Sequence, residues 1–100
     1  MHSTAPVVNV ALPEALRSLC GQETSARPVL RLTAGTVRDL LLELARVHPQ
    51  VHIRVCDESG QPRQHINVFV NEDHVRARAG LDTSLSAGDT VSILPAVSGG

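Results

Sequence analysis

The sequence predicts an α+β protein in which one amphipathic helix covers one face of a mixed β-sheet. Three observations support this fold class. One stretch carries apolar residues at helical spacing, several short stretches alternate between apolar and polar residues, and 100 residues is the size of one domain. Hydrophobic residues make up 42% of the chain and Phe69 is its only aromatic residue, so the core must be aliphatic.

Charge and thiol content exclude several classes of partner. The formal net charge is −1, which argues against nucleic acid or an acidic membrane surface, and all nine basic residues are arginine. Apolar runs are shorter than the ~18 residues of a membrane span, and no signal peptide is visible. Cys20 and Cys56 are isolated thiols. We therefore expect a cytoplasmic protein with reduced cysteines.

The first third of the chain predicts two strands. Pro6–Leu12, "PVVNVAL", is β-branched and alternating, and Val29–Leu32 is a second short apolar stretch. Between them we expect a short helical turn around Ala15–Leu19 and an irregular polar loop, because the connection is too long for a tight hairpin.

The clearest element is a helix within Thr33–His48. Thr33, Gly35 or Thr36 can start it, and Pro49 should end it at or before His48. Its apolar residues recur at helical spacing and form one stripe: Val37, Leu40, Leu41, Leu44 and Val47.

The remaining elements are short. Val51–Asp57 indicates a strand or an irregular extended segment, and His65–Ala77 a hairpin that turns at Asn71–Asp73. A connection with a helical turn near Leu81–Leu85 then leads to a last strand, Asp89–Pro95, "DTVSILP". This order of strand, strand, helix, short strand, hairpin and strand matches a β-grasp, the ubiquitin-like roll.

Alternation sorts the strand residues onto two faces of the sheet. The aliphatic rows should lie beneath the helix: Val8, Val10, Leu12, Leu30, Leu32, Ile66, Val68, Val70, Val91 and Ile93. The opposite face should be mostly polar, as at Asn9, Arg31, Asn67, Asn71 and Ser92, with Val7, Val29, Phe69 and Leu94 as apolar members. Phe69 and Leu94 are then either ordinary surface residues, residues covered by a loop, or a docking patch.

The chain resembles the ubiquitin-like sulfur carrier proteins of the MoaD, ThiS and CysO family, with CysO as the nearest branch. The resemblance rests on "INVFVNEDHVR", followed by "GLDTSLSAGDTVSILPAVSGG", and more loosely on "GTVRDLLLELARVHP". Its most specific part is a Gly-Gly that follows the last strand of a β-grasp. The resemblance implies a β-grasp domain at 1–95 and a flexible tail at 96–100.

In this family, the resemblance implies, the carboxylate of Gly100 is adenylated and then converted to a thiocarboxylate, with Gly99 beside it. The implied partners are a MoeB- or ThiF-type activating enzyme of the E1-like class, a rhodanese or cysteine desulfurase as sulfur donor, and a cysteine synthase-like or thiazole synthase-like acceptor. The resemblance also implies that the activating enzyme uses ATP, and that the chain itself binds no cofactor and is not an enzyme. We expect partners to contact Phe69, Leu94, Pro95, Ala96, Val97 and Ser98.

The tail chemistry agrees with the residues. A carboxylate is a poor electrophile, so ATP must activate it inside a partner, and residues 96–100 can reach about 17 Å when extended. Glycine lacks Cβ and can thread a narrow channel, while Pro95 ends strand pairing. An ordinary frayed terminus is the alternative.

Other functions stay open. The same Gly100 could form isopeptide bonds as a ubiquitin-like modifier, although the chain has no lysine through which to build chains on itself. A MoaD-type subunit of molybdopterin synthase and a passive interaction domain are further alternatives. His52 and Cys56 would share a face of a strand, but their spacing is poor for zinc, and neither cysteine has the partners of a catalytic nucleophile.

Overall fold

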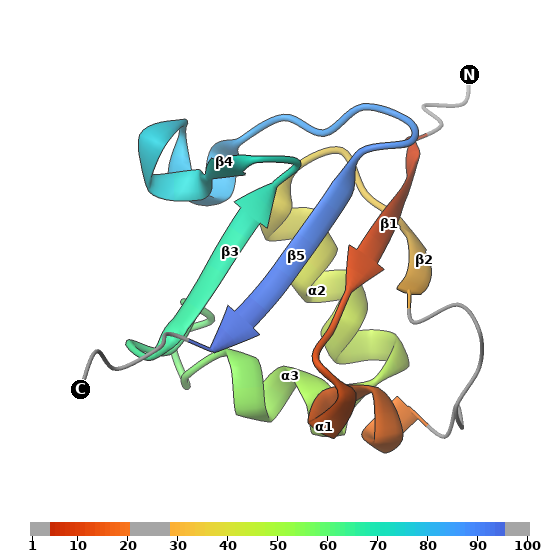
Figure 1. The fold of residues 1–100 in the computed structure, drawn as a ribbon, viewed down its shortest axis with the longest axis vertical. Helices are drawn as coiled ribbons and strands as arrows, with labels where there is room; N and C mark the ends of the chain where they lie inside the picture. Colours follow the sequence, from red (N-terminus) through yellow and green to blue (C-terminus); the bar gives the residue numbers. More distant parts are fainter. Residues whose placement is uncertain (1–4, 21–28, 96–100) are drawn as a thin grey trace.

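The computed structural model describes residues 5–20 and 29–95 of the chain. Its sheet has the order β2-β1-β5-β3-β4 (Figure 1). Strand β1 (Val7–Ala11) pairs antiparallel with β2 (Val29–Thr33) and parallel with β5 (Thr90–Pro95). On its other side β5 pairs antiparallel with β3 (Ile66–Val70), which is followed at the edge by the two-residue β4 (Asp73–His74). The first and last strands of the sheet are therefore neighbours, and the predicted β-grasp is confirmed.

The turn between β3 and β4 is built by Asn71. Its φ of +56° lies in the left-handed region, which asparagine tolerates better than most residues. The Asn71 side chain also accepts the Thr90 N–H at 3.0 Å and donates to the Asp89 carboxylate at 3.2 Å. The turn comprises Asn71 and Glu72, one residue less than predicted, because β4 already begins at Asp73.

The main helix α2 (Val37–Val47) begins where its sequence predicts. The Thr36 hydroxyl accepts the Asp39 N–H at 3.1 Å and so caps the first turn. The expected stripe is buried at Val37, Leu40, Leu41 and Leu44 but not at Val47, whose side chain is 40% exposed. The prediction for Val47 was wrong because the helix ends there and the chain turns at His48.

A second helix follows at once and was not predicted. Residues Pro49–Val55 form α3, so the expected strand or extended segment at Val51–Asp57 is wrong. Proline is well suited to the first helical position, since it fixes φ and needs no N–H partner there. Val51 and Val55, four residues apart, face the core, whereas Ile53 between them is 60% exposed.

The shorter elements join these parts. The predicted turn after β1 is α1 (Glu14–Arg17) with the 3-10 helix η1 (Ser18–Cys20). After β4 come two further 3-10 turns, η2 (Val75–Ala77) and η3 (Gly80–Asp82), the second of which lies slightly earlier than predicted. The buried Thr83 hydroxyl donates to the Gly80 carbonyl at 2.7 Å and accepts the Ala79 N–H at 3.1 Å, which fixes this connection.

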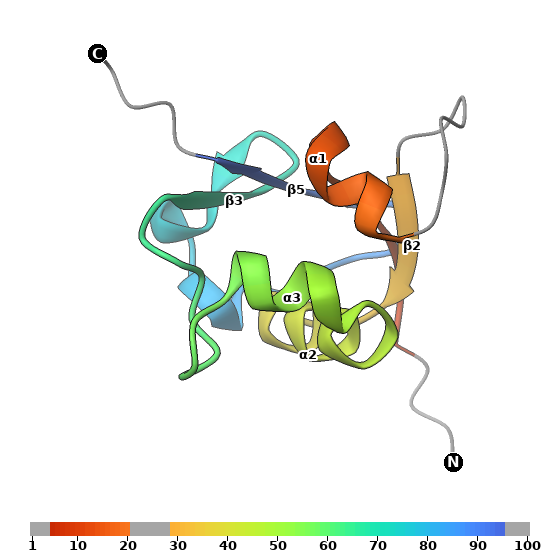
Figure 2. The ribbon, with the colours of Figure 1, turned by 90° about the horizontal axis from the view of Figure 1, so that it is seen from below.

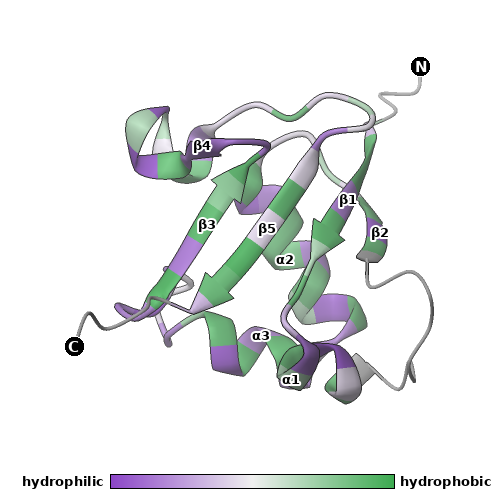
Figure 3. Ribbon diagram, viewed as in Figure 1, coloured by the Kyte–Doolittle hydropathy of each residue, from purple (hydrophilic) through white to green (hydrophobic). Residues whose placement is uncertain are grey.

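The helices α2 and α3 form one layer beneath the sheet (Figure 2). Hydropathy alternates along β3 and β5 (Figure 3), and buried residues alternate with more exposed ones along both strands. Every residue predicted for the helix-facing rows is buried in a single hydrophobic cluster: Val8, Val10, Leu12, Leu30, Leu32, Ile66, Val68, Val70, Val91 and Ile93.

Candidate functional site

The carboxyl end of β5 is the root of the tail. Leu94 lies opposite Asn67 and Pro95 opposite Ile66, so β3 holds this end of β5 up to its last residue. Pairing with β1 stops earlier, at Ser92. The last residues of β5 are therefore paired with β3 on one side and not paired with β1 on the other, near the left edge of the fold in Figure 1.

A proline is compatible with position 95 because its missing N–H removes no hydrogen bond between β5 and β3. The Asn71 N–H donates to the Thr90 carbonyl at 2.7 Å, which sets the phase of the antiparallel ladder between β3 and β5. Bonded pairs recur every second residue, so Ile66 and Pro95 form a non-bonded pair. The β1 side, to which an N–H at residue 95 would point, is already unpaired. The described part of β5 extends to Pro95, and the residues that would test whether pairing stops there lie outside the described ranges.

The face of the sheet away from the helices carries a small mixed surface beside this root, which we call the outer patch: Asn67, Phe69, His74 and Leu94. Leu94 is 40% exposed, and Phe69 is half-buried. The Phe69 and His74 rings meet edge to face, with centroids 5.0 Å apart and an interplanar angle of 74°. Phe69 and Leu94 share this face, as predicted, but Phe69 is partly covered by His74.

Hydrogen bonds fix the His74 ring. Its Nδ1 accepts the backbone N–H of Arg76 at 3.0 Å, so Nδ1 carries no proton in this arrangement. The proton is then on Nε2, which lies 3.1 Å from the Asn67 side-chain oxygen and donates to it. The outer patch is thus ordered by its own contacts. Sequence reasoning missed His74, although a two-residue turn after Val70 would have placed it opposite Phe69.

The remaining predicted site residues lie outside the described residues: Ala96, Val97, Ser98, Gly99 and Gly100. The structure therefore places Phe69, Leu94 and Pro95 near the root of the tail. The roles expected of residues 96–100 stay predictions.

Cys56 has the environment of an inert thiol. It follows α3, is buried with 2% exposure, and its N–H donates to the His52 carbonyl at 2.8 Å. Burial, and secondarily the Asp57 carboxylate, raise the pKa of the Cys56 thiol to about 11. The thiol is protonated near neutral pH and does not supply a thiolate nucleophile.

The strand geometry expected for His52 and Cys56 is replaced by a helix. Across residues 5–20 and 29–95, no three His, Cys, Asp or Glu side chains are grouped as a metal site would require. In the same ranges, each helix is too short or too polar to span a bilayer.

Several known proteins are similar to this chain in sequence and in fold. The model of the ThiS family matches residues 12–100. The chain belongs to the ThiS family. It is 33% identical over 95 residues to the sulfur carrier protein CysO of Mycobacterium tuberculosis, covering 93% of this chain and 98% of that protein.

Two solved structures extend the relationship. Small archaeal modifier protein 1 from Methanosarcina acetivorans is 32% identical with a TM-score of 0.77, over 99% of this chain and 100% of that one. In the BexX/CysO complex of Amycolatopsis orientalis, a matching chain is also 32% identical with a TM-score of 0.77, over 93% of this chain and 99% of that one. The chain is thus a ubiquitin-like β-grasp protein of a family of sulfur carriers and modifiers.

Proposed function

We propose that this protein is a sulfur carrier, used as a cosubstrate by partner enzymes, whose reacting group is the Gly100 carboxylate. The observation that carries this proposal is the match to the ThiS family over residues 12–100, which includes the tail. The geometry of β5 supports it. A tail that performs chemistry elsewhere needs a rigid root, and β5 is a central strand held by β3 as far as Pro95.

The proposed reaction has two steps, both in a partner's active site. The Gly100 carboxylate oxygen attacks the α-phosphorus of ATP, forming an acyl-adenylate and releasing pyrophosphate. A sulfur nucleophile, delivered as hydrosulfide or as a donor persulfide, then attacks the acyl carbon and displaces AMP. With a persulfide, reduction of its sulfur–sulfur bond by a thiol leaves the thiocarboxylate. ATP belongs to the activating enzyme, and the carrier contributes its terminal carboxylate.

The partners follow from these steps. An E1-like enzyme of the MoeB or ThiF type would activate the chain, a rhodanese or cysteine desulfurase would supply sulfur, and a biosynthetic enzyme would accept it. The outer patch is the proposed docking surface for the activating enzyme, because it combines the exposed Leu94 with Phe69 and adjoins the tail root. An enzyme bound there meets the tail as it leaves the sheet.

The length of the tail provides the test. Pyrophosphate exchange with the cognate activating enzyme, followed by intact mass after addition of a sulfide source, should show adenylation and then exchange of one oxygen for sulfur. Deleting Gly99 and Gly100 should abolish both readouts and leave the unfolding midpoint unchanged, because the arm is shortened by about 6–7 Å. Adding one residue after Gly100 should also block the reaction unless the extension is removed. Undiminished exchange by the truncated chain would refute the proposal.

A ubiquitin-like modifier is the second candidate, favoured by the similarity to small archaeal modifier protein 1. It shares the adenylation step and differs in the attacking group, which would be a lysine amine of a target protein. Because this chain has no lysine, targets must be other proteins or a free α-amine. In the same mass experiment, covalent protein adducts would identify the modifier, and a thiocarboxylate without adducts the carrier.

A further inference from the structure

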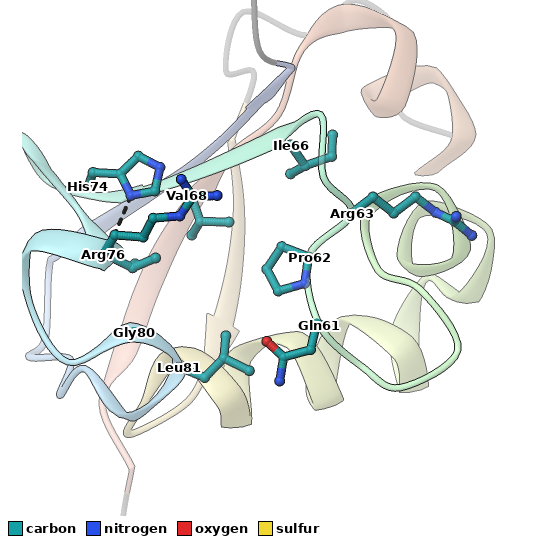
Figure 4. Close-up of a pocket in the computed structure, with 10 residues that line it drawn as sticks. Gln61, Pro62, Arg63, Ile66, Val68, His74, Arg76, Gly80 and Leu81 are labelled. Atoms are coloured by element: carbon teal, nitrogen blue, oxygen red, sulfur yellow. Dashed lines mark hydrogen bonds between the residues drawn. The ribbon is translucent and has the colours of Figure 1, made fainter.

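His74 lies where β4 ends and the chain leaves the sheet. Its side chain caps the 3-10 turn η2, because the ring Nδ1 accepts the backbone N–H of Arg76 (Figure 4). The same ring meets Phe69 edge to face and donates from Nε2 to the Asn67 side-chain oxygen. One imidazole therefore holds both the start of η2 and two members of the outer patch.

Only the neutral ring of His74 can make these contacts. A backbone N–H donates and cannot accept, so Nδ1 must present a lone pair to Arg76. An imidazolium carries a proton on both nitrogens, and its Nδ1 proton would point at the Arg76 N–H. Two donors would then face each other, and the ring would have to turn away. Protonation of His74 therefore removes the cap of η2 and moves the ring that covers Phe69.

A pocket of about 170 Å³ gives the ring space in which to turn (Figure 4). It lies between β3, the turns η2 and η3, and the loop before β3, and His74 is part of its lining. β4 has only two residues, so the chain turns into η2 directly after His74 and leaves this space beside β3. The ring therefore has room to leave its hydrogen bonds.

The charged groups near His74 do not compensate an imidazolium. Arg63 and Arg76 line the same pocket, and no carboxylate among the described residues does so. The β3 side chains that the ring contacts are an amide and a phenyl group, and η3 contributes only uncharged residues to the lining. The carboxylate next to the ring in the chain, that of Asp73, is paired with Arg78 at 3.7 Å. A protonated ring thus finds no carboxylate in the pocket to replace the bond that it loses.

We propose that His74 is a positioning residue for docking of the activating enzyme: it holds the Phe69 ring in place while neutral and releases it when protonated. The inference rests on the proposed function, because it takes the outer patch as the docking surface. Histidine is the side chain whose charge ordinarily changes between about pH 5 and 8. Docking should therefore weaken as His74 takes up a proton, before any chemistry at the tail.

The free chain tests the link between the two rings. Long-range ¹H–¹⁵N spectra of the ¹⁵N-labelled full chain should show the His74 ring protonated at Nε2 alone at about pH 8. As the pH is lowered, the signals of the Phe69 ring and of the Arg76 amide should move with the same midpoint as those of the His74 ring. A His74 ring protonated at Nδ1, or Phe69 signals that stay constant down to about pH 5, would overturn the proposal.

The His74→Asn variant separates the ring from the cap. Asparagine is a favoured capping residue whose oxygen can still accept the Arg76 N–H, but it brings no ring to Phe69 and does not titrate. At about pH 8 the variant should bind the activating enzyme about two- to tenfold more weakly, as expected for loss of an edge-to-face aromatic pair. The two proteins should bind more alike as the pH falls, because the histidine ring then also leaves Phe69.

The ratio of the two dissociation constants is the quantity to follow, since titration of the enzyme itself affects both proteins. His52→Asn is the matched control: it removes a half-buried histidine from α3, in the layer beneath the sheet, and should bind like the unsubstituted protein at every pH (Figure 2). A ratio for His74→Asn that stays constant with pH would refute the positioning role.

Exchange kinetics separate this inference from the proposed function. In pyrophosphate exchange, His74→Asn should raise the KM for the carrier and leave kcat unchanged, because the reacting tail is intact. No exchange by the unsubstituted chain would refute the proposed function. Normal exchange with equal KM values for both proteins at each pH would refute only the role of His74.

Discussion

Ile93 and Leu94 are consecutive residues of β5, yet they serve opposite faces of the sheet. Ile93 is fully buried against the helix layer, and Leu94 is 40% exposed beside the root of the tail. The inner face is a continuous aliphatic surface. The outer patch has only two large apolar side chains, Phe69 and Leu94, and the Phe69 ring packs edge to face against the His74 ring. If the outer patch docks a partner as proposed, stability and recognition depend on opposite faces of the same strand, and single substitutions can address either one.

The largest effect is expected on the inner face. Ile93→Ala should lower the free energy of unfolding by about 2–5 kcal/mol, because it leaves a cavity between the sheet and the helices. Urea titration of both proteins measures the difference. A loss below about 1 kcal/mol would mean that this face is not packed as described.

The burial of Cys56 should make the free energy of unfolding depend on pH. Its pKa is about 11 in the folded protein against an ordinary value of 9.0, so the unfolded chain releases the thiol proton first. The free energy of unfolding should therefore be unaffected by this group below pH 9 and fall as pH rises towards 11, by about 2–3 kcal/mol in total.

The Cys56→Ala variant isolates this contribution. Its stability should depend less steeply on pH in that window than the stability of the unsubstituted protein. Parallel curves for the two proteins would show that the thiol is as well hydrated in the folded state as in the unfolded state.

The outer face should respond in binding rather than in stability. Leu94→Ala should weaken the complex with the activating enzyme by more than about 1 kcal/mol, or about fivefold, and change the free energy of unfolding by less than that. Phe69→Ala should weaken binding similarly, with an added stability cost from the lost contact with His74. Calorimetric titration together with urea unfolding separates the two effects. Unchanged binding by both variants would remove the outer patch from the docking surface.

The smallest effect is expected at Val7. This residue is 50% exposed on the outer face, but it begins β1 at the end of the sheet opposite to Leu94. Val7→Thr should change both stability and enzyme binding by less than about 0.5 kcal/mol. A large loss of binding at Val7 would extend the docking surface across the whole outer face.

The strands and α2 were predictable because their patterns are local and consistent. α3 was not, because "VHIRV" alternates like a strand while Val51 and Val55 are also one helical turn apart. Val51, Ile53 and Val55 fit the two-residue period of a strand, while Val51 and Val55 alone also fit one turn of a helix. Packing against the rest of the protein decides between the two. Pro49 was the overlooked signal, since it stops one helix and is also a favourable first residue of the next.

For the site, the sequence could place Phe69 and Leu94 on one face, because strand alternation determines that much. It could not show that His74 covers part of Phe69 or that its Nδ1 accepts the Arg76 N–H, since both depend on where the chain leaves β4. A two-residue strand has no clear sequence pattern, and its shortness creates the pocket.

The position of β5 between β1 and β3 also governs how the protein is made. β5 is synthesised after every other strand, and until it emerges β1 and β3 have no common neighbour in the sheet. Folding therefore depends on pairing residues such as Val10 and Val91 across most of the chain, a slow type of contact. A translation product that stops short of β5 lacks both the strand that completes the sheet and the tail that follows it. We therefore expect a product that stops before β5 to be unfolded, because it lacks the strand that β1 and β3 both pair with.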